Sequence, residues 1–154
     1  MKKQAEPLVI HDGPPPLAGA RARRWVISST LEAKLPLLEE VLNFIRDRGW
    51  VRPQTMMKVR LCLDEGLINA IDHGNARDPA KSVTVTLYDN TGEWGVTIED
   101  QGEGFEPADV PDANDPGSVL LEGGRGILLM RSLMDEVYYW DRGTRVYLRK
   151  RVDS

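Results

Sequence analysis

The sequence predicts an α+β fold, a two-layer sandwich in which helices cover one face of a mixed, mostly antiparallel sheet. Three observations predict it. Two long segments in the first half repeat apolar residues at helical spacing, later segments alternate apolar and polar residues as strands do, and glycine-containing turns join neighbouring strands. Because hairpins dominate this order, we expect the helices to gather on one side of the sheet.

The first elements are a strand over residues 24–28 and a helix that runs to about Arg48, where Gly49 stops it. Ser29, followed three residues later by Glu32, predicts a capping box at the start of this helix. The apolar residues that keep helical spacing along it are Leu31, Leu35, Leu38, Leu42 and Ile45.

A second helix should begin at Pro53, which suits a first turn, and end at Gly74 as its C-cap. Its apolar side can be supplied by Leu61, Ile68 and Ile71. Glu65 and Asn69 are four residues apart and therefore share one face. A carboxylate and an amide so placed could polarise a hydroxyl and ligate a hard cation. Exposed Glu and Asn on a helix are more often simply solvated, so this pair needs further support.

The second half predicts two hairpins around a loop and a short helix. Residues 82–88 alternate apolar and polar side chains, and a turn at residues 89–92 leads into a strand over 93–99. Residues 100–125 form a loop rich in Gly, Pro and Asp, a length that is usually functional or disordered. A helix over 126–134 and a hairpin with its turn at Arg142-Gly143 close the chain.

The composition gives a single domain and few functional clues. We expect residues 1–22 to be a flexible N-terminal extension, either a disordered tail or a partner-binding arm, and residues 23–154 to form one domain. A net charge of −4 gives no argument for nucleic acid or an anionic membrane. Neither a bilayer-spanning run nor a signal peptide is visible. Cys62 is the only cysteine, which fits a reducing cytosol, and we expect a buried, inert thiol.

Two glycine-rich segments lie downstream of the second helix. In the first, directly after a strand, Asp100 can accept a hydrogen bond from an exocyclic amino group such as that of adenine. Gly102 and Gly104 would let the backbone approach a flat ring or a phosphate. Taken alone, this short motif is better explained as an acidic turn whose glycines have positive φ.

The second segment covers residues 122–127 and opens the short helix. Glycines at a helix start can aim free backbone N–H groups at an anion, and Arg125 adds a cation that could contact phosphate. A hinge with a solvated arginine is the plainer alternative. The pattern is neither a P-loop nor the dinucleotide fingerprint.

Taken together, these segments resemble the Bergerat-fold (GHKL-type) ATPases, the superfamily of gyrase, histidine-kinase and mismatch-repair ATP-binding domains. Glu65 and Asn69 match its first box, residues 100–104 its second, residues 124–126 its third and Gly143-Thr144 its last. Order and spacing agree over about residues 24–149. Within the superfamily, residues 69–75 and 124–135 look most like those of the bacterial anti-sigma factor serine/threonine kinases.

The resemblance implies a role for each matching residue. Glu65 would act as general base on the hydroxyl of an incoming serine, and Asn69 would ligate Mg²⁺ at the phosphates of ATP. The other implied nucleotide contacts are Asp100 to the adenine amino group with support from Thr144, Gly102 and Gly104 along the base, and Gly124, Arg125 and Gly126 at the phosphates. His73 either orients the phosphate end or the Asn69 side chain, or is a structural histidine beside the helix end.

The resemblance also implies a function and partners. The protein would phosphorylate a small anti-sigma factor antagonist, sequester a sigma factor in the alternative state and form a homodimer, with no direct contact to nucleic acid or membrane. The rival interpretation is a nucleotide-dependent switch module that binds its partner without transferring phosphate; a family member that binds no nucleotide is a third. Residues 106–122 carry five acidic residues and no Lys or Arg, which predicts repulsion of a triphosphate.

Overall fold

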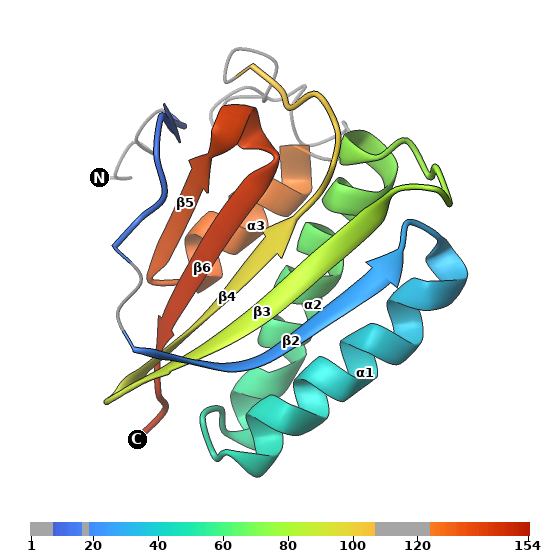
Figure 1. The fold of residues 1–154 in the computed structure, drawn as a ribbon. Coiled ribbons are helices and arrows are strands. Elements are labelled where there is room, and N and C mark those ends of the chain that lie inside the picture. Colours follow the sequence, from blue (N-terminus) through green and yellow to red (C-terminus); the bar gives the residue numbers. More distant parts are fainter. Residues whose placement is uncertain (1–7, 17–18, 107–123) are drawn as a thin grey trace.

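The computed structural model describes residues 8–16, 19–106 and 124–154 (Figure 1). Within these residues, six strands form one sheet in the order β1-β5-β6-β4-β3-β2, and Figure 1 shows helices α1–α3 on one side of it. All pairings are antiparallel except that of β1 with β5. The predicted α+β sandwich with a mixed, mostly antiparallel sheet is therefore confirmed.

The element bounds follow the predicted order with shifted ends. The strands are β1 (Ile10–His11), β2 (Ala20–Ser28), β3 (Ser82–Asn90), β4 (Glu93–Glu99), β5 (Glu136–Trp140) and β6 (Arg145–Arg151). The helices are α1 (Leu31–Asp47), α2 (Pro53–Ile68) and α3 (Gly124–Leu133), with a π-helical turn at Asn69–Gly74 and a 3₁₀ turn at Asp141–Gly143. The core lies between sheet and helices, where alternate residues of the central strands are buried, among them Val83, Val85, Leu87, Val96 and Ile98.

The start of α1 differs from the prediction. Thr30 is the N-cap, and its Oγ1 accepts a hydrogen bond from the Ala33 N–H at 3.2 Å. Ser29 is instead fully buried, with a partner elsewhere in the fold. Leu31 and Leu35 keep helical spacing but are 39% and 53% exposed, because the stripe that faces the sheet is Leu37, Leu38, Val41, Leu42 and Ile45.

The end of α2 also corrects the prediction. The α-helix stops at Ile68, and the chain continues through the wider π turn to Gly74. Gly74 does not have the positive φ of a left-handed C-cap; Ala76 and Arg77 do, with φ of 52° and 56°. Leu61, predicted on the apolar side, is 45% exposed, whereas Ile71 is fully buried. The π turn changes which residues face the core beyond Ile68, and helical periodicity could not predict that change.

Part of the predicted flexible extension belongs to the sheet. Ile10 and His11 form the edge strand β1 and pair with β5, and β2 begins at Ala20, before the predicted start. The Tyr138 hydroxyl donates to the Gly13 carbonyl at 3.0 Å, and the His11 and Tyr138 rings stack with centroids 3.8 Å apart. The prediction is wrong for these residues because β5 offers unpaired backbone groups that the segment satisfies. The wider division into extension and domain stays a prediction.

Cys62 is fully buried, and burial raises the pKa of its thiol to about 11, as expected for an inert cysteine. No helix in the described ranges has the length and apolar character needed to cross a bilayer.

Candidate active site

The first and third motifs contact each other. The start of α3 packs against the end of α2, as Figure 1 shows. A Cβ placed on Gly126 would lie 2.7 Å from Glu65 Oε2 and 3.4 Å from Asn69 Nδ2. The absent side chain of Gly126 therefore allows α3 to reach both predicted residues of the helix, so the structure brings Glu65, Asn69 and Gly126 into contact.

Asp100 lies where the second and last motifs meet. Its backbone N–H donates to the Thr144 carbonyl at 2.9 Å, and its Oδ1 accepts from the Gly102 N–H at 2.8 Å. A Cβ on Gly74 would overlap the Asp100 carboxylate. Gly74 is thus required for close approach rather than for a turn, and the second and last motifs meet the end of the first at this carboxylate.

Burial raises the pKa of the Asp100 carboxyl from 3.8 to about 6; the Gly102 N–H and Lys81 act in the opposite direction, and Asp141 adds to the rise. The group is still mainly ionised at pH 7. It can therefore accept a hydrogen bond from an amino group. Because the carboxylate is already partly buried, less water must be removed when a ligand binds than at a fully hydrated carboxylate.

The glycines of the second motif differ in their structural roles. Gly104 has φ of +87°, and a Cβ there would overlap the Arg142 carbonyl, which accepts the Phe105 N–H at 2.9 Å. Gly143, with φ of +89°, leaves room for the Phe105 ring. Gly102 has no positive φ, but a Cβ placed on it would collide with the Gly74 carbonyl. The loop after β4 is therefore pressed against the Asp141–Gly143 turn and the π turn together.

Asn69 has the strongest single signal for a ligand. Both polar atoms of its side chain, Oδ1 and Nδ2, are buried without a hydrogen-bond partner among the residues that the structure describes. Leaving such groups unpaired costs about 1–3 kcal/mol, so the arrangement favours an external partner.

The donor set near Asn69 fits a magnesium–phosphate centre. No cluster of three or more His, Cys, Asp or Glu side chains suited to a metal occurs in the described parts of the chain. Mg²⁺ usually keeps several waters and binds substrate phosphates with one or two protein oxygens. A single buried amide oxygen beside a helix start is consistent with that chemistry, because such a centre does not need a metal site made entirely of protein ligands.

His73 and Arg125 are less well placed. The His73 side chain is exposed and does not hydrogen-bond the unpartnered Asn69 amide, so its predicted role stays a prediction. Gly124 and Arg125 open α3 as expected, but the Arg125 side chain lies outside what the structure describes, as does the acidic segment over residues 107–122.

Asn75 was missed by sequence reasoning. It is fully buried, its Oδ1 accepts the Gln101 N–H at 2.7 Å, and its Nδ2 donates to Ser29 Oγ and to the Ser82 carbonyl. An asparagine after a glycine suggests an exposed turn, so no local signal revealed it. Ser29 and Gln101 are 46 and 26 residues away in sequence, and only the folded chain brings them to Asn75.

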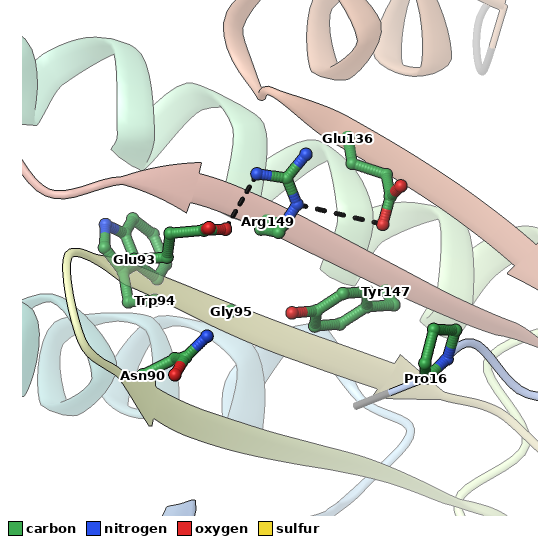
Figure 2. A pocket seen from close by; sticks show the side chains of 8 residues that line it. All are labelled: Pro16, Asn90, Glu93, Trp94, Gly95, Glu136, Tyr147 and Arg149. Carbon is green, nitrogen blue, oxygen red and sulfur yellow. Dashed lines mark hydrogen bonds and ion pairs between the residues drawn. The ribbon is translucent and has the colours of Figure 1, made fainter. Parts of the chain in front are cut away.

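A hollow of about 350 Å³ lies on the opposite, helix-free face of the sheet (Figure 2). Glu93 and Glu136 flank Arg149 at 2.7 and 3.9 Å, above the bare backbone of Gly95. The Tyr147 ring occupies the space where a Gly95 side chain would stand. None of the predicted site residues lines this hollow, so it is separate from the site on the α2–α3 side.

Comparison with known proteins gives consistent similarities. Residues 27–150 match the family described as histidine kinase-like ATPase domain. The chain is 30% identical over 104 residues to the anti-sigma F factor of Geobacillus kaustophilus (strain HTA426), covering 63% of this chain and 70% of that protein. It is 29% identical over 108 residues to the anti-sigma F factor of Clostridium perfringens (strain 13 / Type A), covering 66% and 76%. The family match includes all predicted site residues, from Glu65 to Thr144.

Proposed function

Because the chain belongs to the family of histidine kinase-like ATPase domains, we propose that it is an ATP-dependent protein serine/threonine kinase of the anti-sigma factor type. The family supports ATP binding, and the relatives' name supports the regulatory role. The observation that carries the proposal is the buried, unpartnered amide of Asn69 beside Glu65, at the start of α3.

Asp100 recognises the base. Its ionised carboxylate accepts from the adenine amino group, and Thr144 supports it through the hydrogen bond between the Asp100 N–H and the Thr144 carbonyl. Gly102 and Gly104 keep the neighbouring backbone free of side chains, so that a flat ring can lie against it.

The phosphates lie at the start of α3. Gly124 and Gly126 present backbone N–H groups there, where the helix dipole favours negative charge, and Arg125 adds a cation. Asn69 Oδ1 would hold Mg²⁺, which would neutralise negative charge at the phosphates. Positioning and electrostatics supply most of the catalysis in phosphoryl transfer, so this set is chemically sufficient.

Glu65 takes the proton of the incoming serine hydroxyl. The serine oxygen forms a bond to the γ-phosphorus, the bond from that phosphorus to the bridging oxygen breaks, and ADP leaves with the electron pair. The proton passes to the Glu65 carboxylate and returns to solvent.

The proposed partners are supported by the relatives, which are named anti-sigma F factors. The substrate is a small antagonist protein with one reactive serine, and in the alternative state the protein sequesters a sigma factor. We expect a homodimer in the bacterial cytoplasm, without direct contact to DNA or membrane.

One observation favours a second candidate, a nucleotide-dependent switch that transfers no phosphate. The Glu65 carboxylate makes no hydrogen bond or ion pair with the part of the chain that the structure describes. No hydrogen bond or ion pair in that part fixes its orientation as a base, whereas nucleotide binding through Asp100 and Asn69 does not depend on Glu65.

The decisive experiment uses γ-labelled ATP, Mg²⁺ and a candidate small antagonist protein. The wild type should label one serine; Glu65→Ala should bind ATP and the partner but transfer nothing, and Asn69→Ala should lose the Mg²⁺-dependent part of nucleotide binding. A folded wild type that binds ATP without labelling the antagonist would rule out the kinase and support the switch.

A further inference from the structure

Asn75 uses its whole side chain to join three segments that are far apart in sequence. Its Nδ2 donates to Ser29 Oγ at the end of β2 and to the Ser82 carbonyl at the start of β3, the latter at 2.9 Å. Its Oδ1 accepts the N–H of Gln101, the residue after Asp100, at 2.7 Å. Because Asn75 is fully buried, each of these bonds replaces one that water would otherwise make.

The bond to Gln101 completes a clamp on Asp100. The Asp100 N–H is held by the Thr144 carbonyl at 2.9 Å, and the next N–H along the chain is held by Asn75. The two peptide groups that flank the Asp100 Cα are therefore both fixed. Gly74, which precedes Asn75, meets the carboxylate itself. The direction in which the carboxylate leaves the backbone is set from both sides.

We propose that Asn75 is the positioning residue that gives this site its preference for adenine over guanine. It acts through Asp100 and contacts no nucleotide, and the inference rests on the base-recognition role proposed for Asp100. Adenine offers an amino donor where guanine offers a carbonyl acceptor. A carboxylate aimed at that position binds the first and repels the second, and one that is free to turn discriminates less.

Asparagine suits this position for a chemical reason. The position needs two donors and one acceptor within one short, neutral side chain. Alanine would leave the partly buried Gln101 N–H and the buried Ser29 hydroxyl without the partner that Asn75 provides. Aspartate would keep an acceptor for the Gln101 N–H but lose the donors to Ser29 and Ser82.

The test compares Kd values of the full chain for ATP and GTP, both with Mg²⁺, with melting temperatures measured in parallel. Asn75→Ala should reduce the ATP preference by about tenfold, the effect of one misplaced charged hydrogen bond. Asn75→Asp should melt earlier but keep most of the preference, because its oxygen still accepts from Gln101. Ser29→Ala is the matched control: it removes one Asn75 partner without touching Gln101, so only stability should fall.

The outcomes separate this inference from the proposed function. Asp100→Asn serves as reference; an unchanged ATP preference in that variant would overturn base recognition by Asp100 and the inference with it. A collapsed preference in Asp100→Asn beside a wild-type preference in Asn75→Ala would overturn only the inference. If Asn75→Ala does not fold, the comparison of Asn75→Asp with Ser29→Ala decides the question. If Ser29→Ala and Asn75→Asp lost the ATP preference to the same extent, Asn75 would have a purely structural role.

Discussion

Replacing Gly126 by alanine should slow phosphate transfer while leaving the free energy of unfolding almost unchanged. The new Cβ would lie 2.7 Å from Glu65 Oε2 and 3.1 Å from Glu65 Cβ. Because ordinary carbon contacts begin near 3.4 Å, the carboxylate must retreat by about 0.7 Å. It is the far end of a flexible side chain and can do so.

The two effects on stability oppose each other. Alanine is favoured over glycine within a helix by about 0.5–1 kcal/mol. The tight contact with Glu65 Cβ costs a similar amount, so the net change should stay within about 1 kcal/mol. Catalysis has no such compensation. A displacement approaching 1 Å at a reacting group costs up to about 100-fold, so transfer should slow by roughly 10- to 100-fold.

The assay is single-turnover transfer of labelled phosphate to the antagonist, with urea unfolding of the same preparations. Gly66→Ala is the matched control, because its Cβ would also lie 2.7 Å from the end of a side chain, but from the core atom Ile98 Cδ1. That variant should lose stability and keep its transfer rate per folded molecule. If Gly126→Ala transferred phosphate at the normal rate while Glu65→Ala transferred none, the Glu65–Gly126 contact would not position the base.

Four further predictions follow from the same geometry. With an Asp100 pKa of about 6, the preference for ATP over GTP should decline as pH falls from 7 to 5, because protonation removes the acceptor. Asp100→Asn should show no such pH dependence. The same decline in that variant would refute base recognition by Asp100. Gly74→Ala should lower the ATP preference about tenfold by displacing that carboxylate, as measured by Kd values for both nucleotides. Asn69→Ala should not lower the melting temperature of the nucleotide-free protein, because it removes two unpaired buried atoms, but it should remove the Mg²⁺-dependent part of the rise produced by ATP. Tyr138→Phe removes the bond to the Gly13 carbonyl, so hydrogen exchange over residues 9–14 should accelerate; unchanged exchange would show that the bond does not hold this segment.

The Asp100 pKa also has a consequence for folding. The pKa of the Asp100 carboxyl is about 6 in the folded protein, above its ordinary value of 3.8. The folded form therefore binds more protons than the unfolded form between pH 3.8 and 6. The contribution of this group to stability is therefore largest at acid pH and is lost as pH rises through about 6.

The sequence predicted the fold and the chemistry of the site through local patterns. Alternation in β3 placed Val83, Val85 and Leu87 on the buried face, as the structure confirms. Spacing of four residues put Glu65 and Asn69 on the face that meets Gly126. Such patterns are readable because the periodicity of a helix or strand fixes which side chains share a face.

Periodicity was a poorer guide at the ends of elements. The capping box assigned to Ser29 is wrong because Thr30 caps α1 and Ser29 is needed by Asn75. Leu35 has the right spacing and is nevertheless exposed, since the sheet determines which of two neighbouring apolar stripes is buried. The π turn after Ile68 left no mark in the apolar pattern.

By itself, then, the sequence determined the fold class, the order of the four motifs, and which residues carry a carboxylate, an amide or a bare backbone to the site. Only the tertiary structure decided how they are held. The Asn75 side chain reaches partners 46 and 26 residues away, and Tyr138 binds Gly13 across 125 residues. Contacts of this kind arise when the sheet closes, and the free energy that stabilises them comes from burial that no local stretch of sequence contains.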